Sequence, residues 1–359
     1  MTRFRELLEG RISSILKSSA RVSSERIDYL DGWRACSILL VIVGHFALLP
    51  TLYGRDFYTA RAGVEAFFVL SGRLMAGILF LRGTSIGTFY GRRFARVFPA
   101  YAVLVVLLAT FGFLSAFDVV AALTFTANYF YPSEYIEHTW SLCVEEHSYL
   151  LLGLLAYTCR DRLPPRLLPA LLLLFAAAMM ANGAIQTGLM HRDYHEVYWH
   201  SDVRAASVLV SAGIYLIAVG RRVSPLIPIA APVIGLFLLI PYSIPDPVKY
   251  TLGTTFLAIG ICTLDSAWNW VRATLSVRPL CMVGFWSYSL YLWQQPLYLQ
   301  QPAINKAALL TATLLAALFS YYVIENPARR YLNLKLAKIT CRQKRLPRFS
   351  SFQQQKWWS

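Results

Sequence analysis

Long apolar runs separated by short basic segments constrain the fold of this chain more than any other feature. A helix needs about 20 mostly apolar residues to cross a bilayer, and the sequence holds about ten runs near that length. Only 15% of the residues are charged, whereas a soluble domain carries about a quarter. We therefore predict an all-α, polytopic integral membrane bundle of about ten transmembrane helices. The predicted spans are residues 35–51, 63–81, 99–117, 142–158, 167–185, 203–219, 225–241, 250–267, 281–299 and 306–324.

A further apolar stretch covers residues 118–130, but Asp118 and Asn128 interrupt it. We interpret it as a re-entrant or interfacial piece, because polar groups inside a span need partners that lipid does not provide.

The distribution of Lys and Arg predicts which side of the membrane each loop faces. Cytoplasmic loops carry an excess of these residues. When the N-terminus is placed inside, the cations gather in the N-terminal segment, in every second loop and in the C-terminal segment. We therefore predict an N-in/C-in topology, with a basic tail at 1–26, a membrane domain at 27–332 and a second basic tail at 333–359. The opposite loops hold only Arg55, Arg61, Arg192, Lys249 and Lys306.

The net charge of +15 does not indicate a nucleic-acid partner, because the cations are dispersed among tails and short loops. Residues 1–33 lack the apolar core of a cleavable signal peptide. The apolar residues of this segment recur at helical spacing, which fits either a helix on the anionic inner leaflet or a disordered tail.

No metal site is predicted. The six cysteines show no ligand spacing. Residues 186–202 combine His191, His195 and His200 with Tyr and Trp, which an interfacial aromatic belt explains, with sugar or metal binding as the alternative.

Ionisable residues inside apolar runs are functional candidates, because burying them in lipid is costly. Arg34 begins the first span and His45 lies about three helical turns further along, so the two share one face, with the imidazole near the middle of the membrane. An imidazole titrates near neutrality and can take a proton from a hydroxyl. The structural alternative is an interhelical hydrogen bond of His45 beside an ordinary positive-inside Arg34.

Acidic residues mark the second and fourth spans. Glu65 lies near the outer end of the second span, and Ser71 and Gly72 follow at middle depth, where small residues also let helices approach closely. Glu145 and Glu146 are adjacent in the first turns of the fourth span and cannot both face lipid. We expect one of them to orient the ring of His45, and the sequence leaves open which.

Three arginines, Arg92, Arg93 and Arg96, are predicted in a short cytoplasmic loop that enters the third span. If this loop is helical, Arg92 and Arg96 form one cationic face. Guanidinium groups bind phosphates with paired hydrogen bonds, so the cluster indicates a phosphate-bearing ligand. Ordinary positive-inside charge with lipid head-group contacts is the alternative.

Taken together, these residues and their spacing resemble the membrane acyltransferase family 3, which includes O-acetyltransferases of bacterial surface polysaccharides. The resemblance covers residues 26–332. The Arg-to-His spacing of the first span and the WSL..VEE string of the fourth are specific when taken together. The stretches that carry it are RIDYLDGWRACSILLVIVGHF, GVEAFFVLSG, FYGRRFARVFPAY, TWSLCVEEHSYLLLG, SYSLYLWQQP and YYVIENPARR.

The resemblance implies a ten-helix membrane acyltransferase domain in the bacterial inner (plasma) membrane, which takes an acyl group from acyl-CoA at the cytoplasmic face. Similar proteins often carry His where this chain has Gln294, and an aromatic residue where it has Arg73. The implied catalytic residues are Arg34, His45, Glu145 and Glu146, and the implied cofactor-binding residues are Arg92, Arg93 and Arg96.

We accordingly expect an O-acetyltransferase that uses acetyl-CoA without a metal. The expected acceptor is a hydroxyl of a surface glycan, such as lipopolysaccharide or exopolysaccharide, or of its lipid-linked precursor. His45 would act as general base or as transient acyl carrier, and Trp140 would stack on the sugar. The candidate substrate-binding residues are Glu65, Ser71, Trp140 and Tyr291.

Two other classes of function fit the same residues. A proton-coupled transporter of an anionic or sugar substrate would use His45, Glu65 and Glu145 as a proton relay. A non-catalytic membrane scaffold would need none of the charges. Within the enzyme class, the acceptor could also be a lipochitooligosaccharide, peptidoglycan or a secreted small molecule. The oligomeric state is not predicted.

Overall fold

The computed structural model describes residues 27–46, 57–130, 132–160, 162–164, 166–301 and 303–345, and every regular element in these ranges is helical. The predicted all-α fold is confirmed. The helices are α2 (Asp28–His45), α3 (Phe57–Ala76), η2 (Gly77–Leu81), α4 (Ile86–Thr110), α5 (Ala116–Leu123), η3 (Ala127–Tyr129), η4 (Glu137–Thr139), α6 (Trp140–Cys159), α7 (Leu167–Gly188), α8 (Tyr194–Tyr198), α9 (Ser201–Arg204), α10 (Ala206–Ala218), α11 (Ile227–Leu239), α12 (Asp246–Val248), η5 (Lys249–Gly253), α13 (Thr254–Thr263), η6 (Leu264–Ser266), α14 (Asn269–Leu275), α15 (Arg278–Tyr298), α16 (Lys306–Phe319), η7 (Ser320–Glu325) and α17 (Asn326–Arg345).

Five helical segments of the described chain are long and apolar enough to cross a membrane. Each overlaps one of the predicted spans, so the chain is a membrane protein, and the full set of about ten spans stays a prediction. The five segments are Tyr58–Leu81, Ile86–Thr110, Leu167–Gly188, Ser201–Ala218 and Lys306–Ala337. The predicted tail at 1–26 lies outside the described residues, as do residues 346–359 of the predicted tail at 333–359, whereas residues 333–345 belong to α17.

Two local expectations need correction. The arginine-rich segment was predicted as a loop, but α4 begins at Ile86 and includes it. The stretch 118–130 contains the short helix α5, and Asp118 starts that helix rather than breaking it. Ser115 and Asp118 form a reciprocal capping box, which satisfies N–H groups that the first helical turn leaves without partners.

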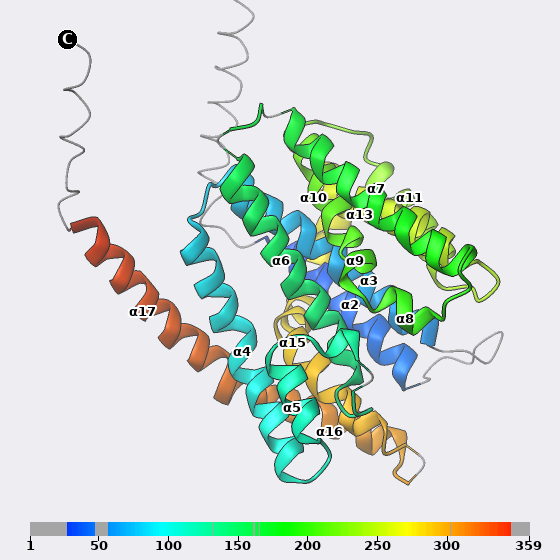
Figure 1. Ribbon diagram of the computed structural model, residues 1–359, viewed down its shortest axis with the longest axis vertical. Helices are drawn as coiled ribbons and strands as arrows, with labels where there is room; N and C mark the ends of the chain where they lie inside the picture. The colour runs from blue at the N-terminus through cyan, green and yellow to red at the C-terminus, as the bar shows by residue number, and fades with distance from the viewer. Residues whose placement is uncertain are drawn as a thin grey trace, which may run out of the picture.

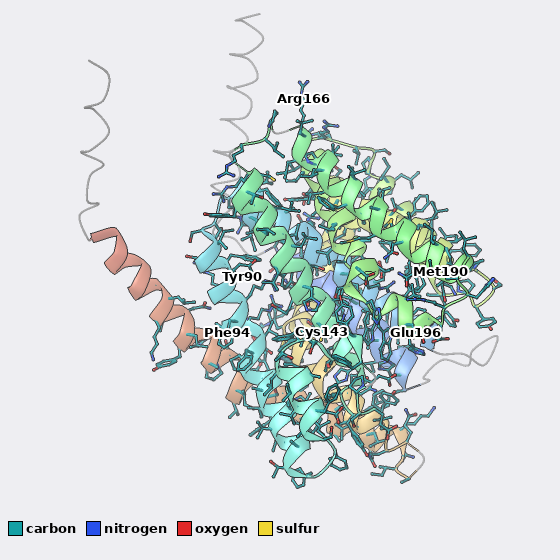
Figure 2. All side chains as sticks on the ribbon, viewed as in Figure 1. Tyr90, Phe94, Cys143, Arg166, Met190 and Glu196 are labelled. Atoms are coloured by element: carbon teal, nitrogen blue, oxygen red, sulfur yellow. The ribbon has the colours of Figure 1, made fainter. Side chains whose placement is uncertain are left out.

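Helix α3 lies at the centre of the bundle and packs against α2, α10, α13 and α6. Figure 1 shows α7, α10, α11 and α13 grouped on one side, α4 and α5 on the other, and α17 running outward beside α4. Side chains fill the space between the ribbons (Figure 2). A Cβ atom at Gly72 would lie 2.2 Å from the Val208 carbonyl oxygen, so only glycine permits the close approach of α3 to α10.

Two ion pairs account for charges within the apolar runs, and one of them is buried on both sides. Glu65 and Arg204 meet at 2.6 Å with both side chains almost completely buried, and Thr254 donates a 2.5 Å hydrogen bond to the same carboxylate. The buried Arg73 pairs at 2.8 Å with the half-exposed Asp265 of η6. Because removing one partner of a buried pair leaves an uncompensated charge, the Glu65–Arg204 pair fixes how α3 sits against α9.

Candidate functional site

The helices enclose two adjoining cavities. The first, which we call the arginine cavity, has a volume of about 740 Å³ and includes Arg34, Arg93 and Arg96 in its lining. The second, the histidine cavity, has a volume of about 550 Å³ and includes His45, His138 and His195. Val64 and Tyr291 line both, so these two side chains form their common boundary.

A third hollow, of about 980 Å³, continues from the arginine cavity toward the end of the bundle where α2 begins. It shares Arg34, Leu74 and Arg96 with that cavity and adds Arg82 and Arg329. The three spaces therefore follow one another along the bundle, and most of the guanidinium groups line the arginine cavity and the third hollow.

The arginine cavity is a cationic site, and its arginines come from α2 and α4. Arg34 forms a 2.6 Å ion pair with Asp31. The guanidinium of Arg93 lies 4.3 Å from the centre of the Tyr149 ring and contacts the Met75 sulfur at 3.1 Å. Arg96 has no carboxylate within ion-pair distance in the described part of the chain, so its donors are available to a ligand.

Arg92 does not belong to this site, contrary to the expectation that Arg92 and Arg96 share a face toward the ligand. Its side chain is exposed and lines none of the three hollows. Adjacent helical residues point about 100° apart, so α4 turns Arg93 and Arg96 inward and leaves Arg92 outside.

Glu145 and Ser71 lie together in the wall of the arginine cavity. Ser71 and Tyr149 each donate a hydrogen bond to the same oxygen of Glu145. Glu145 is the one carboxylate among the described residues that line this cavity. Glu146, on the next position of α6, lines neither cavity.

His45 is the last residue of α2 and lines the histidine cavity. Its Nδ1 lies 2.6 Å from the side-chain oxygen of Gln294, and its ring stacks on Tyr298 with the centres 4.9 Å apart. An amide oxygen only accepts hydrogen bonds, so Nδ1 carries the proton and Nε2 of the neutral ring is the acceptor. Gln294 therefore fixes both the orientation and the tautomer of His45.

These contacts correct two expectations about His45. The predicted carboxylate partner is wrong, because Glu145 is held by Ser71 and Tyr149 in the other cavity and Gln294 occupies Nδ1. The predicted bounds of the span also shift, because α2 runs from Asp28 to His45 and His45 is its last residue, while the depth of His45 in the membrane stays a prediction. Arg34 and His45 do lie on the same side of α2, since each opens into one of the two adjoining cavities.

The expected role of Glu65 also needs correction. We expected it to bind substrate, but it lines neither cavity and is buried against Arg204 and Thr254. The apolar environment makes this closed pairing the favourable state of both charges.

Aromatic rings form the walls of the histidine cavity. Trp140 stacks on Trp199 with the ring planes 3° apart and the centres 5.9 Å apart. The Arg61 guanidinium lies 3.6 Å from the centre of the Tyr194 ring. Flat aromatic faces with a few polar groups at the edges are suited to the apolar faces and hydroxyls of a sugar ring.

Tyr291 lines both cavities, and its hydroxyl is held by two hydrogen-bonding contacts. It donates to the backbone oxygen of His138 at 2.7 Å and lies 2.6 Å from the Ser141 hydroxyl. Its ring faces Phe67 on one side and His138 on the other. The predicted substrate-binding residues Trp140 and Tyr291 thus lie in the histidine cavity, and Ser71 and Tyr291 lie in the arginine cavity.

Sequence reasoning missed Gln294 as the partner of His45, and it missed His138 and Arg61 as cavity residues. In the sequence, Gln294 stood out only because similar proteins often carry His at this position. His138 lies two residues before the WSL string, and that position is the one signal in the sequence that marks it. Among the described residues, no cluster of three or more His, Cys, Asp and Glu side chains has the arrangement of a metal site.

Comparisons with known proteins find O-acetyltransferases among the proteins similar to this chain. Peptidoglycan O-acetyltransferase OatA of Listeria monocytogenes is 28% identical in an alignment 376 positions long that covers 88% of this chain and 58% of that protein. O-acetyltransferase OatA of Staphylococcus aureus is 27% identical in an alignment 350 positions long that covers 84% of this chain and 57% of that protein. The chain therefore spans less than two thirds of the length of these relatives. No solved structure matches it.

The family comparison covers most of the chain. A family model described as an acyltransferase domain matches residues 27–324, which include both cavities and every helix from α2 to α16. The chain belongs to the acyltransferase 3 family.

Proposed function

We propose that this protein is a membrane O-acetyltransferase that moves an acetyl group from acetyl-CoA to a hydroxyl of a cell-surface glycan. One observation carries the proposal: a cationic cavity and an aromatic, histidine-lined cavity meet at Val64 and Tyr291. Such a pair of sites suits a donor that carries phosphates and an acceptor that carries hydroxyls.

The donor occupies the arginine cavity and the hollow that continues from it. Arg34, Arg93 and Arg96 bind the phosphates of coenzyme A, since guanidinium groups form charge-assisted hydrogen bonds with phosphate oxygens. The thioester end then reaches toward the boundary at Tyr291. Ser71 and Glu145 lie beside this path.

The acceptor sugar occupies the histidine cavity, with Trp140 against one face of the ring. His45 Nε2 takes the proton of the acceptor hydroxyl while its oxygen attacks the thioester carbonyl carbon. The carbon–sulfur bond breaks, the coenzyme A thiolate leaves, and the proton passes from the imidazole to that thiolate. Gln294 holds the ring in the tautomer that this step requires.

We further propose an N-in/C-in topology of about ten spans in the bacterial inner membrane, with the arginine cavity on the cytoplasmic side. The name of the Listeria relative makes peptidoglycan the first acceptor to test. Lipopolysaccharide and exopolysaccharide, or their lipid-linked precursors, are the alternatives within the same chemistry.

The test compares base-labile acetate on surface glycans of cells that produce wild-type protein or His45→Ala at equal levels. General-base catalysis contributes about 10²- to 10⁴-fold, so His45→Ala is expected to lose nearly all acetylation. Undiminished acetylation in this variant contradicts the proposed role of His45. Substrate flux into proteoliposomes without acetyl-CoA would favour the transporter instead. A covalent acetyl-protein trapped with radiolabelled acetyl-CoA would make His45 an acyl carrier instead of a base.

A further inference from the structure

The histidine cavity contains a second imidazole with an unusual environment. His138 is 4% exposed, and neither ring nitrogen has a hydrogen-bond partner within the described part of the chain. Buried polar groups are nearly always hydrogen-bonded, so an unpartnered buried ring that lines a cavity indicates a ligand.

The surroundings of His138 leave one of its two ring nitrogens as a hydrogen-bond acceptor toward the cavity. The backbone carbonyl of Leu292 in α15 lies close enough to the ring to act on its pKa, although the contact falls short of hydrogen-bond geometry. Pro296 lies one helical turn further along α15 and has no N–H, so this carbonyl lacks its usual helical donor. An N–H of His138 directed at that carbonyl leaves the other nitrogen as an acceptor toward the cavity.

The protonation state of His138 agrees with this role. The residue lies in the turn η4, and burial together with the neighbouring His45 lowers its pKa to about 3. The ring is therefore neutral at pH 7 and keeps one acceptor nitrogen. Its position is fixed, because Tyr291 bonds to its backbone oxygen at 2.7 Å and faces its ring at 5.3 Å between centres.

His138 thus presents one acceptor nitrogen to the cavity that His45 also lines. We propose that His138 is a specificity-determining residue that accepts a hydrogen bond from a second donor on the acceptor sugar, an O–H or N–H on the carbon next to the acetylated one. The acceptor class is then a sugar with two neighbouring hydrogen-bond donors. This inference rests on the proposed acetyltransferase function.

The experiment uses the full chain in lipid nanodiscs, with acetyl-CoA as donor and p-nitrophenyl hexosides and their monodeoxy analogues as acceptors. For the wild type, loss of the neighbouring donor is expected to lower kcat/KM roughly tenfold or more, because a buried acceptor is left unpaired. In His138→Leu, the parent and deoxy acceptors are expected to react at nearly equal rates.

Conservative variants separate this role from a structural one. His138→Asn and His138→Gln each keep one donor and one acceptor, and at least one is expected to restore discrimination between the two acceptors. His191→Asn, in an exposed loop that lines no cavity, is the matched control and should discriminate like the wild type.

The possible outcomes are distinguishable. If the wild type transfers acetyl groups but His138→Leu discriminates as strongly as the wild type, the role of His138 is overturned while the proposed function stands. If both amide variants behave like His138→Leu, the ring acts through packing and the hydrogen-bonding role is overturned. If the wild type acetylates no acceptor, the proposed function fails, and this inference fails with it.

Discussion

At the scale of single residues, α4 sorts three neighbouring arginines into two kinds. Arg93 and Arg96 face the arginine cavity, whereas Arg92 is exposed. Their chemical nature is identical, so only the direction of the side chain distinguishes them. This gives a matched pair of variants for the donor site.

We expect Arg96→Gln to raise the KM for acetyl-CoA about tenfold, since one charge-assisted hydrogen bond contributes about 1.5–3 kcal/mol. Arg92→Gln should stay within about twofold of the wild type, because an exposed charge is well screened. Initial rates of purified protein against acetyl-CoA concentration measure both. Equal effects of the two substitutions would contradict a phosphate-binding role for the cavity.

The sequence predicted the residue types of this site better than their partners. The common side of Arg34 and His45 follows from helical geometry within α2 alone, so it was predictable. The partner of His45 was not, because Gln294 comes from α15, and the rotation of one helix against another depends on packing over the whole bundle. Glu65 was misassigned for the same reason, since Arg204 lies far along the chain.

At the scale of helices, the centre of the fold depends on close approach of backbones. Without a hydrophobic driving force between helices in lipid, small residues at the contact supply the packing. Gly72 brings α3 against α10, and the same helix holds Ser71 in the arginine cavity and Val64 at the boundary. The position of α3 therefore sets the shape of both cavities.

We expect Gly72→Val to lower the thermal unfolding temperature in detergent and to lower acetyl transfer, because its side chain would collide with the Val208 backbone. Gly87→Ala is the control, since a Cβ atom there meets nothing within 4 Å. Alanine is a better helix former than glycine, so this variant should be at least as stable as the wild type. An unchanged unfolding temperature for Gly72→Val would show that α3 and α10 can separate without cost.

At the scale of the whole molecule, the apolar runs and their flanking cations predicted a membrane protein, and five long helices bear this out. Length and apolar composition are local properties of the chain, which is why they could be read directly. Helices α6 and α15 carry Glu145 and Gln294 toward the cavities, and such polar interiors make spans harder to recognise from sequence.

Reporter fusions test the predicted topology of the whole chain. A phosphatase that is active only outside the cytoplasm should be active when fused after Met190 or Ser243, and a cytoplasmic fluorescent reporter should be bright after Gly83 or Gly220. The positive-inside rule gives this pattern. The opposite pattern at any of the four sites would require a different number of spans before it.

The shared boundary at Val64 and Tyr291 has a consequence for the bilayer itself. A single open passage lined by arginines and histidines would let protons and small ions leak down their gradients. We expect Val64 and Tyr291, which line both cavities, to interrupt such a passage. On the proposed topology, the acetyl group passes from the coenzyme A thioester in one cavity to the sugar hydroxyl in the other at this boundary. The transfer would then need no open channel through which ions could leak.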